Sequence, residues 1–180
     1  MSWRRCILLA SAPMTSCRTH VLLLLTSIAT IGCDRVTKEV ASTTLAGMPV
    51  QSLWGDTVRL ELTENTGAFL GLGADWPESA RTTIFVLGTG VLLATMLVAA
   101  ARSSWTLAAR LGVAFMAAGG LSNLIDRVAY GSVVDFLNIG VGSLRTGIFN
   151  VADVAILAGV ALVASGGPWS AFRGSSRPGR

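Results

Sequence analysis

Four long runs of uncharged, mostly apolar residues constrain this 180-residue chain more than any other feature. The runs cover about residues 19–33, 82–101, 111–125 and 154–172. A helix that crosses roughly 30 Å of hydrocarbon needs about 20 residues, so the second and fourth runs are long enough as they stand. The first and third are short by about a turn, so either they take in the flanking Arg18 and Arg110, whose side chains can reach the membrane surface, or the acids that end them, Asp34 and Asp126, lie at membrane depth. The sequence therefore predicts four transmembrane helices at about 19–35, 82–101, 107–125 and 153–172.

The composition excludes several classes of protein. Charged residues make up 13% of the chain, against about 25% in an ordinary soluble domain, and hydrophobic residues make up 52%. This composition disfavours a soluble single-domain enzyme and excludes a disordered chain. The chain has one lysine, Lys38, and one histidine, His20. A single histidine leaves almost no residues from which to build a histidine-based zinc site or a Ser-His-Asp triad. Its basic residues are scattered rather than clustered, which excludes a nucleic-acid-binding face, and we expect neither a metal nor another cofactor.

The distribution of charges predicts the orientation in the membrane. Cytoplasmic segments carry an excess of lysine and arginine. Eight of the 14 basic residues lie in the N-terminal segment, the loop between the second and third spans, and the tail, which contain no acid: Arg4, Arg5, Arg18, Arg102, Arg110, Arg173, Arg177 and Arg180. All 10 acidic residues lie in the remaining segments. Both termini are therefore predicted to be cytoplasmic, with outer segments at 34–81 and 126–153.

The outer segments contain patterns typical of strands. Residues 57–63 alternate polar and apolar side chains, which indicates a half-buried strand, and residues 133–139 read as short strands and turns. The predicted fold class is a membrane all-α core of four transmembrane helices with a small β-rich extracytoplasmic cradle. It forms one integral-membrane domain over residues 1–166. A cytoplasmic tail at 167–180 overlaps the end of the fourth span.

Four aspartates are candidates for chemistry because each lies at or near the outer end of a predicted span: Asp34, Asp126, Asp135 and Asp153. Two carboxylates close together can share one proton, so that one activates water while the other polarises a carbonyl. This chemistry needs no histidine, serine, lysine or metal. Spacing alone allows any two of the four to form the pair. Asp126 and Arg127 could instead form a structural ion pair, and Asp34 and Lys38 a local helix pair.

Five sequence blocks run in order along most of the chain. They are Asp34–Lys38 (DRVTK), Asn65–Phe69 (NTGAF), Gly119–Arg127 (GGLSNLIDR), Gly131–Phe136 (GSVVDF) and Phe149–Ile156 (FNVADVAI). With these blocks the chain resembles the lipoprotein signal peptidase family, also called signal peptidase II. Three features depart from the family pattern and bear on loop shape and substrate preference. The Asn65–Phe69 block is one residue short, Ser122 stands where glycine is usual, and the 138–147 loop is rich in glycine.

The resemblance implies an aspartic endopeptidase whose catalytic pair is Asp135 and Asp153. It implies supporting or substrate-binding roles for a further set of residues: Asp34, Lys38, Asn65, Gly67, Asn123, Asp126, Arg127, Val134, Asn150 and Ala152. The implied substrate is a diacylglyceryl-modified prolipoprotein, cleaved before its lipid-carrying cysteine. The implied setting is the bacterial inner membrane, where membrane lipids surround a monomer and the active site lies near the extracytoplasmic surface. No cofactor is implied.

Individual roles follow for several of these residues. We expect Asn123 and Asn150 to donate hydrogen bonds to the carboxylates or the substrate backbone, rather than to cap helices. Arg127 is expected to hold Asp126 and the outer loop. Asn65 is expected to contact substrate or orient the pair, the alternative being a turn residue beside Gly67.

Two other functions compete with this interpretation. One is a serine–lysine peptidase, which would combine Lys38 with a serine such as Ser42 or Ser132. The other is a non-catalytic membrane protein, either a transporter or channel subunit or a family member that binds without cleaving. In a transporter the acids would be ion ligands or relay groups facing a pore.

Overall fold

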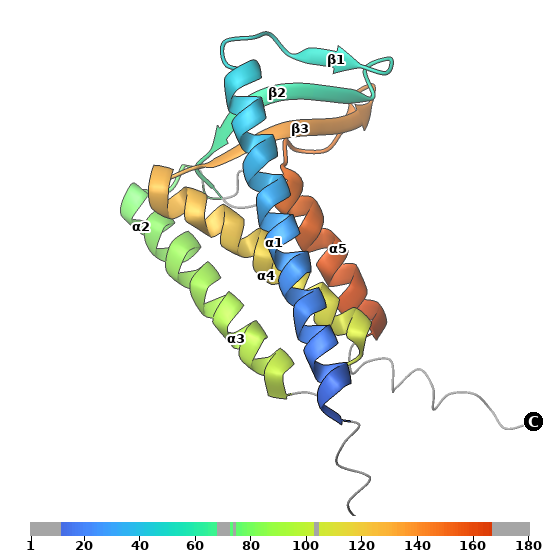
Figure 1. Cartoon of the computed structure of the whole chain (residues 1–180). Helices are drawn as coiled ribbons and strands as arrows, with labels where there is room; N and C mark the ends of the chain where they lie inside the picture. The colour runs from blue at the N-terminus through green and yellow to red at the C-terminus, as the bar shows by residue number, and fades with distance from the viewer. Residues whose placement is uncertain (1–11, 68–72, 74, 103–104, 167–180) are drawn as a thin grey trace, which may run out of the picture.

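A bundle of helices with a small sheet stacked on one end forms the described part of the chain (Figure 1). The computed structural model describes residues 12–67, 73, 75–102 and 105–166. Its helices are α1 (Ala12–Thr44), α2 (Glu78–Thr82), the π-helical turn η3 (Thr83–Gly88), α3 (Thr89–Arg102), α4 (Leu107–Tyr130) and α5 (Val151–Gly166). A mostly helical chain with a small antiparallel sheet agrees with the predicted class.

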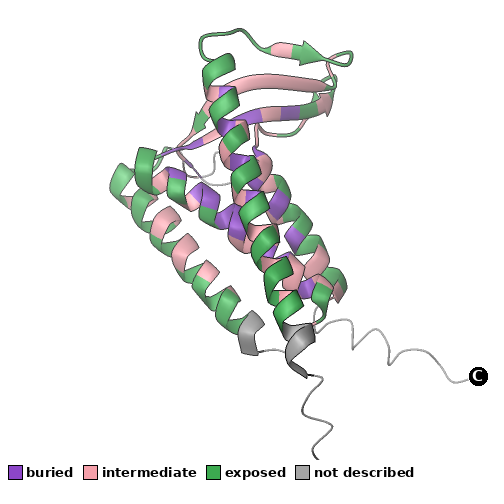
Figure 2. Ribbon diagram, viewed as in Figure 1, coloured by how far each residue is buried: buried purple, intermediate pink, exposed green. Residues whose placement is uncertain are grey.

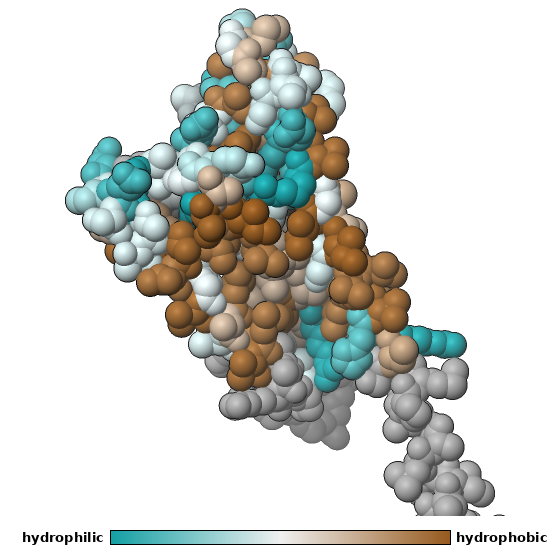
Figure 3. Space-filling model, turned by 60° about the vertical axis from the view of Figure 1, so that its left-hand side comes forward, coloured by the Kyte–Doolittle hydropathy of each residue, from teal (hydrophilic) through white to brown (hydrophobic). Residues whose placement is uncertain are grey.

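Three of these helices are long and apolar enough to cross a membrane: Cys17–Thr44, Glu78–Ala99 and Leu107–Tyr130. The fourth apolar helix, α5, is described for 16 residues. The fourth span was predicted to continue to residue 172, and residues 167–172 lie outside the described part, as does the predicted tail at 167–180. Large apolar side chains on the helices are exposed, and they form the apolar surface that covers the bundle in Figure 3.

Helix α1 continues nine residues beyond the predicted end of the first span, to Thr44. The cause is a buried stripe along one face of the helix, made by Thr30, Asp34, Lys38 and Ala41. Residues three or four positions apart share a face of a helix. Charged side chains therefore turn inward here, and the helix persists where the sequence analysis expected the outer segment to begin.

The sheet has four antiparallel strands in the order β1-β2-β3-β4. They are β1 (Gln51–Leu53), β2 (Val58–Asn65), β3 (Val133–Val141) and β4 (Leu144–Arg145). The strand predicted at 57–63 is thus confirmed as β2. Its pairing with β3 places Thr63 opposite Asp135 and Asn65 opposite Val133. Phe149 bridges to Leu137 of β3, so the chain enters α5 directly beside the sheet.

Glycines let α4 and α5 pack with their backbones in contact. A Cβ atom added to Gly112 would lie 2.6 Å from the carbonyl oxygen of Gly159, and one added to Gly119 would lie 2.5 Å from that of Ala152. Small residues at a helix interface permit this approach in membrane proteins. The contact places the end of α4 nearest the sheet, including Asn123, against the first turn of α5.

We predict that Gly159→Ala destabilises the protein by about 1–3 kcal/mol, because the new methyl group would lie 2.5 Å from the carbonyl oxygen of Gly112. Gly32→Ala in α1 is the matched control, since a Cβ there meets nothing within 4 Å. Thermal unfolding in detergent micelles measures both variants. Equal unfolding temperatures for the two variants would contradict the close contact.

Candidate active site

Buried polar side chains gather where α1, α4 and α5 meet the sheet, at the upper end of the bundle (Figure 2). At most 7% of the surface of each of these residues is exposed: Asp34, Lys38, Ser122, Asn123, Asp126, Asp135 and Asn150. Asp153 is partly exposed beside them. Buried polar groups are costly unless they are hydrogen-bonded, so the contacts within this cluster determine its geometry.

Lys38 lies at the centre of the cluster, with a side chain that is 5% exposed. Its Nζ atom lies 2.7 Å from a carboxylate oxygen of Asp34, one turn earlier on α1, and 2.7 Å from one of Asp126 on α4. It also donates a 2.7 Å hydrogen bond to Oδ1 of Asn123. Three acceptors thus face the three N–H groups of the ammonium. The serine–lysine alternative loses support, because that mechanism needs a lone pair of the lysine nitrogen facing a serine.

The contact with Lys38 fixes the orientation of the Asn123 amide. An ammonium only donates, so Oδ1 of Asn123 must face Lys38 and Nδ2 must point the other way. Nδ2 accordingly donates to Oδ1 of Asp153 over 3.0 Å. Lys38 therefore orients the Asn123 amide so that its nitrogen donates a hydrogen bond to Asp153, one of the two predicted catalytic aspartates.

Asn150 and Asp153 form a reciprocal cap at the start of α5. The backbone N–H of Asp153 donates to Oδ1 of Asn150 over 3.0 Å, and the N–H of Asn150 donates to Oδ2 of Asp153 over 3.1 Å. The N–H of Ala152 donates to Oδ1 of Asp34 over 2.9 Å. Side chains therefore satisfy N–H groups that a helix start leaves unpaired. Asp153 sits in the first turn of α5, where the helix dipole favours negative charge.

Asp135 projects from β3 and accepts one amide on each oxygen. Nδ2 of Asn150 donates to Oδ1 over 2.7 Å, and Nδ2 of Asn65 donates to Oδ2 over 2.9 Å. The N–H of Gly67 occupies Oδ1 of Asn65, which turns the amide nitrogen of Asn65 toward the aspartate. Asn150 performs both roles that the sequence analysis treated as alternatives, because it caps α5 and donates to Asp135.

Arg127 ties the segment that follows β2 to α4. Its Nη2 donates to the carbonyl oxygen of Gly67 over 2.8 Å, and its Nη1 to that of Asn123 over 3.3 Å. The expectation that Arg127 also holds Asp126 is not what the structure shows, because the ion pairs of Asp126 are made by Lys38 and by Arg35. Adjacent helical residues point in different directions, which separates the two side chains.

The remaining predicted residues act through their backbones. The carbonyl oxygen of Val134 accepts a 3.4 Å hydrogen bond from Nδ2 of Asn150. Ala152 is fully buried and acts through its N–H, which donates to Asp34. In the predicted block that begins at Asn65, residues 68 and 69 lie outside the described part of the chain.

Burial dominates the electrostatics of Asp135. The pKa of this carboxyl is raised to about 6, mainly by desolvation and in part by the negative charge of Asp153, while the hydrogen bonds from Asn65 and Asn150 favour its charged form. Two carboxyl groups that repel each other and differ in environment can take different protonation states. Asp135 is therefore suited to hold a proton up to about pH 6, well above the range of an ordinary aspartate.

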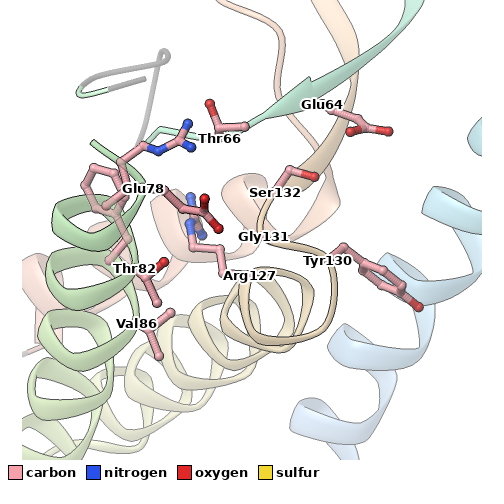
Figure 4. Close-up of a pocket in the computed structure, with 11 residues that line it drawn as sticks. Glu64, Thr66, Glu78, Thr82, Val86, Arg127, Tyr130, Gly131 and Ser132 are labelled. Atoms are coloured by element: carbon pink, nitrogen blue, oxygen red, sulfur yellow. The ribbon is translucent and has the colours of Figure 1, made fainter. Parts of the chain in front are cut away.

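An apolar cavity of about 340 Å³ opens beside Asp153 between α3, α4 and α5. Asn123, Arg127 and Asp153 form its polar side, and most of its remaining lining is apolar: Phe85, Leu92, Leu93, Met96, Met116, Ile156 and Leu157. On another side of Arg127 lies a separate polar pocket of about 200 Å³, between α2 and the end of α4 (Figure 4). No group of three or more His, Cys, Asp or Glu side chains suited to a metal occurs within the described ranges.

The structure brings all four candidate aspartates into one network, together with Lys38, Asn65, Asn123 and Asn150. Two further members were missed by the sequence analysis. Arg35 donates to Asp126 and to Ser122, and the hydroxyl of Ser122 donates to Asp34 over 2.7 Å. The available signals were a basic residue among the outer acids and a serine where glycine is usual.

We predict that Asp135→Asn stabilises the protein increasingly as the pH rises from 4 to 7. The folded-state pKa of about 6 exceeds the ordinary value of 3.8, so the folded state holds this proton more tightly. Wild-type stability therefore falls as the pH rises from about 4 to about 6, because the unfolded chain ionises first, and the variant does not share this loss. The unfolding free energy of the variant minus that of wild type should grow by about 1–3 kcal/mol over this range. A difference independent of pH would contradict the shifted pKa.

Comparisons with known proteins agree with this architecture. A solved bacterial membrane enzyme matches with a TM-score of 0.73 at 23% identity, over 88% of this chain and 94% of that one. Another matches with a TM-score of 0.68 at 26% identity, over 79% and 90% of the two chains. Both solved structures share the fold of this chain, at low sequence identity.

Sequence relatives are more specific. Lipoprotein signal peptidases from Methylobacterium sp. (strain 4-46) and Moorella thermoacetica are 32% and 34% identical to the chain, covering 88% and 78% of it and 96% and 88% of their own lengths. The one from Bifidobacterium adolescentis is 38% identical over 76% of this chain and 71% of its own. The family model described as signal peptidase (SPase) II matches residues 26–166. The chain therefore belongs to the signal peptidase II family.

Proposed function

We propose that the protein is an aspartic endopeptidase that removes signal peptides from lipid-modified prolipoproteins, cleaving before the diacylglyceryl-cysteine. The observation that carries the proposal is the pair Asp135 and Asp153, held by converging amide donors, with Asp153 lining an apolar cavity. Family membership supports the peptidase activity and the class of substrate.

The environments of the two aspartates support an assignment of roles. Asp153, in the first turn of α5, is the ionised general base that takes a proton from water. Asp135 carries the shared proton and gives it to the oxygen of the scissile carbonyl as water attacks the carbon. When the resulting gem-diol collapses, Asp153 protonates the leaving nitrogen and a hydroxyl returns its proton to Asp135. Each carboxyl then regains its starting state.

The cavity supports the lipid requirement. Its apolar lining, between α3, α4 and α5, suits acyl chains, while the polar side at Asn123, Arg127 and Asp153 suits a peptide backbone. A substrate bound there would place its lipid-carrying cysteine next to the catalytic pair.

The arrangement of basic residues supports the proposed orientation. Arg18, Arg102 and Arg110 lie toward the ends of α1, α3 and α4 that are far from the sheet (Figure 1). The positive-inside rule puts that end in the cytoplasm. The sheet and the catalytic pair then lie at the extracytoplasmic surface of the bacterial inner membrane, and both termini are cytoplasmic.

We predict that Asp135→Asn and Asp153→Asn each reduce cleavage of a lipid-modified prolipoprotein by about 10²–10⁴-fold or more, since each removes one proton-transfer group. The assay uses the purified protein in lipid. Asp56→Asn is the matched control, because Asp56 is an outer-segment acid whose ion pair with Arg59 lies at the turn between β1 and β2.

Cleavage above about one tenth of the wild-type rate by either dyad variant would reject the assignment. An unmodified prolipoprotein, tested in parallel, should be cleaved poorly if the cavity holds the acyl chains. Transport through vesicles without any cleavage would favour the non-catalytic alternative.

A further inference from the structure

Arg35, three residues before Lys38 on α1, binds one of the two carboxylates that hold Lys38. Its guanidinium forms an ion pair with Asp126, and Nη2 donates to the carbonyl oxygen of Ser122 over 2.8 Å. Nε donates to the hydroxyl of Ser122 over 3.2 Å. A planar guanidinium satisfies several acceptors at once, which a lysine ammonium could not do in this geometry.

Ser122 links Arg35 to the second counter-ion of Lys38. Its hydroxyl is fully buried, accepts from Arg35 and donates to Oδ2 of Asp34 over 2.7 Å. Arg35 thus supports both carboxylates that hold Lys38, Asp126 directly and Asp34 through this hydroxyl. The glycine that is usual at this position would provide neither contact.

The charges of the cluster are balanced by one proton. Among the described residues, four carboxyl groups and three cations meet at this junction: Asp34, Asp126, Asp135 and Asp153 with Arg35, Lys38 and Arg127. The seven groups are neutral together when one carboxyl carries a proton. Asp34 and Asp126 are committed to ion pairs, so the proton belongs to Asp135 and Asp153.

We propose that Arg35 is a positioning residue that balances the charge of the site for a single proton on the aspartate pair, and that Ser122 locks Arg35 in place. The inference rests on the proposed aspartic mechanism, in which the active pair is singly protonated. Without the charge of Arg35, the neutral state of the cluster has two protonated carboxyls, and the general base is lost until the pH rises further.

Other charged groups near Arg35 are exposed. A cavity of about 780 Å³ beside it is also lined by Glu39 of α1, Glu64 of β2 and Tyr130 of α4. All three of these residues are solvent-exposed, so water screens them. The side chains of Asp34, Lys38 and Asp126 are at most 5% exposed, so they interact with one another and with the pair with little screening, while the side chain of Arg35 is 33% exposed.

The test is the pH profile of kcat for cleavage of a lipid-modified prolipoprotein. Arg35→Gln removes the charge and should move the acid limb up by about 0.5 pH unit or more. Arg35→Lys keeps the charge and should leave the acid limb within about 0.2 pH unit of wild type. Its kcat should fall, because a lysine cannot make the guanidinium contacts with both Ser122 and Asp126. Asp126→Asn, which removes a negative charge, should move the limb down.

Arg110→Gln is the matched control. Arg110 is a partly buried arginine on the same helix as Asp126, 16 residues earlier and therefore about 24 Å away, and its Nε donates to the backbone of Trp105. Its acid limb should coincide with that of wild type. An unmoved limb in Arg35→Gln, or equal shifts in the Lys and Gln variants, would overturn the proposal.

Infrared titration of the protonated-carboxyl band measures the same protonation without any cleavage. The band should persist to higher pH in Arg35→Gln than in wild type, and a coincident titration would overturn the charge balance. If wild type fails to cleave the prolipoprotein, the proposed function fails while the infrared result still decides the role of Arg35. If Arg35→Gln does not fold, the opposite shift in Asp126→Asn decides it, and an unmoved limb there counts against the proposal.

Discussion

The buried ammonium of Lys38 is the group on which the rest of the site depends. Removing a charge from water costs several kcal/mol unless partners surround it. Asp34 provides one partner from the same helix, but Asp126 and Asn123 must come from α4. Satisfying this one lysine therefore fixes the rotation of α1 and its register against α4. It also explains why α1 stays helical well past the apolar stretch that defines its span.

The orientation of the surrounding amide side chains follows from their neighbours, because each amide has a donor end and an acceptor end. Asn123 must turn its oxygen to the ammonium, so its nitrogen meets Asp153. Asn65 and Asn150 have their oxygens occupied by backbone N–H groups, so their nitrogens meet Asp135. Amide groups at three positions are thus oriented by unlike neighbours toward two carboxylates. An apolar or purely anionic neighbour at any of these positions would leave an amide free to flip.

The sequence predicted the components of this site better than their connections. Asp135 and Asp153 stand in distinctive blocks, and the alternation at 57–63 identified the strand that pairs with β3. Spacing could not choose the pair, because the contacts join residues 15 to 118 positions apart. The apolar stretch likewise could not reveal that α1 buries Asp34 and Lys38, because a hydropathy pattern indicates contact with lipid and contains no information on ion pairs between helices. Arg35 and Ser122 were missed for that reason.

Asp135 and Asp153 belong to a strand and a helix, so their separation depends on how the sheet is joined to the bundle. Three sets of contacts fix the start of α5 beside the sheet. Phe149 adds to β3, Asn150 binds both carboxylates, and the N–H of Ala152 is held by Asp34 of α1. On the far side, the glycines of α4 and α5 remove the side chains that would push Asn123 away from Asp153. A pair that must share one proton cannot tolerate drift between its two elements, and here the backbone hydrogen bonds between Phe149 and Leu137, of 2.8 and 2.9 Å, hold the chain entering α5 to β3 without using either carboxylate.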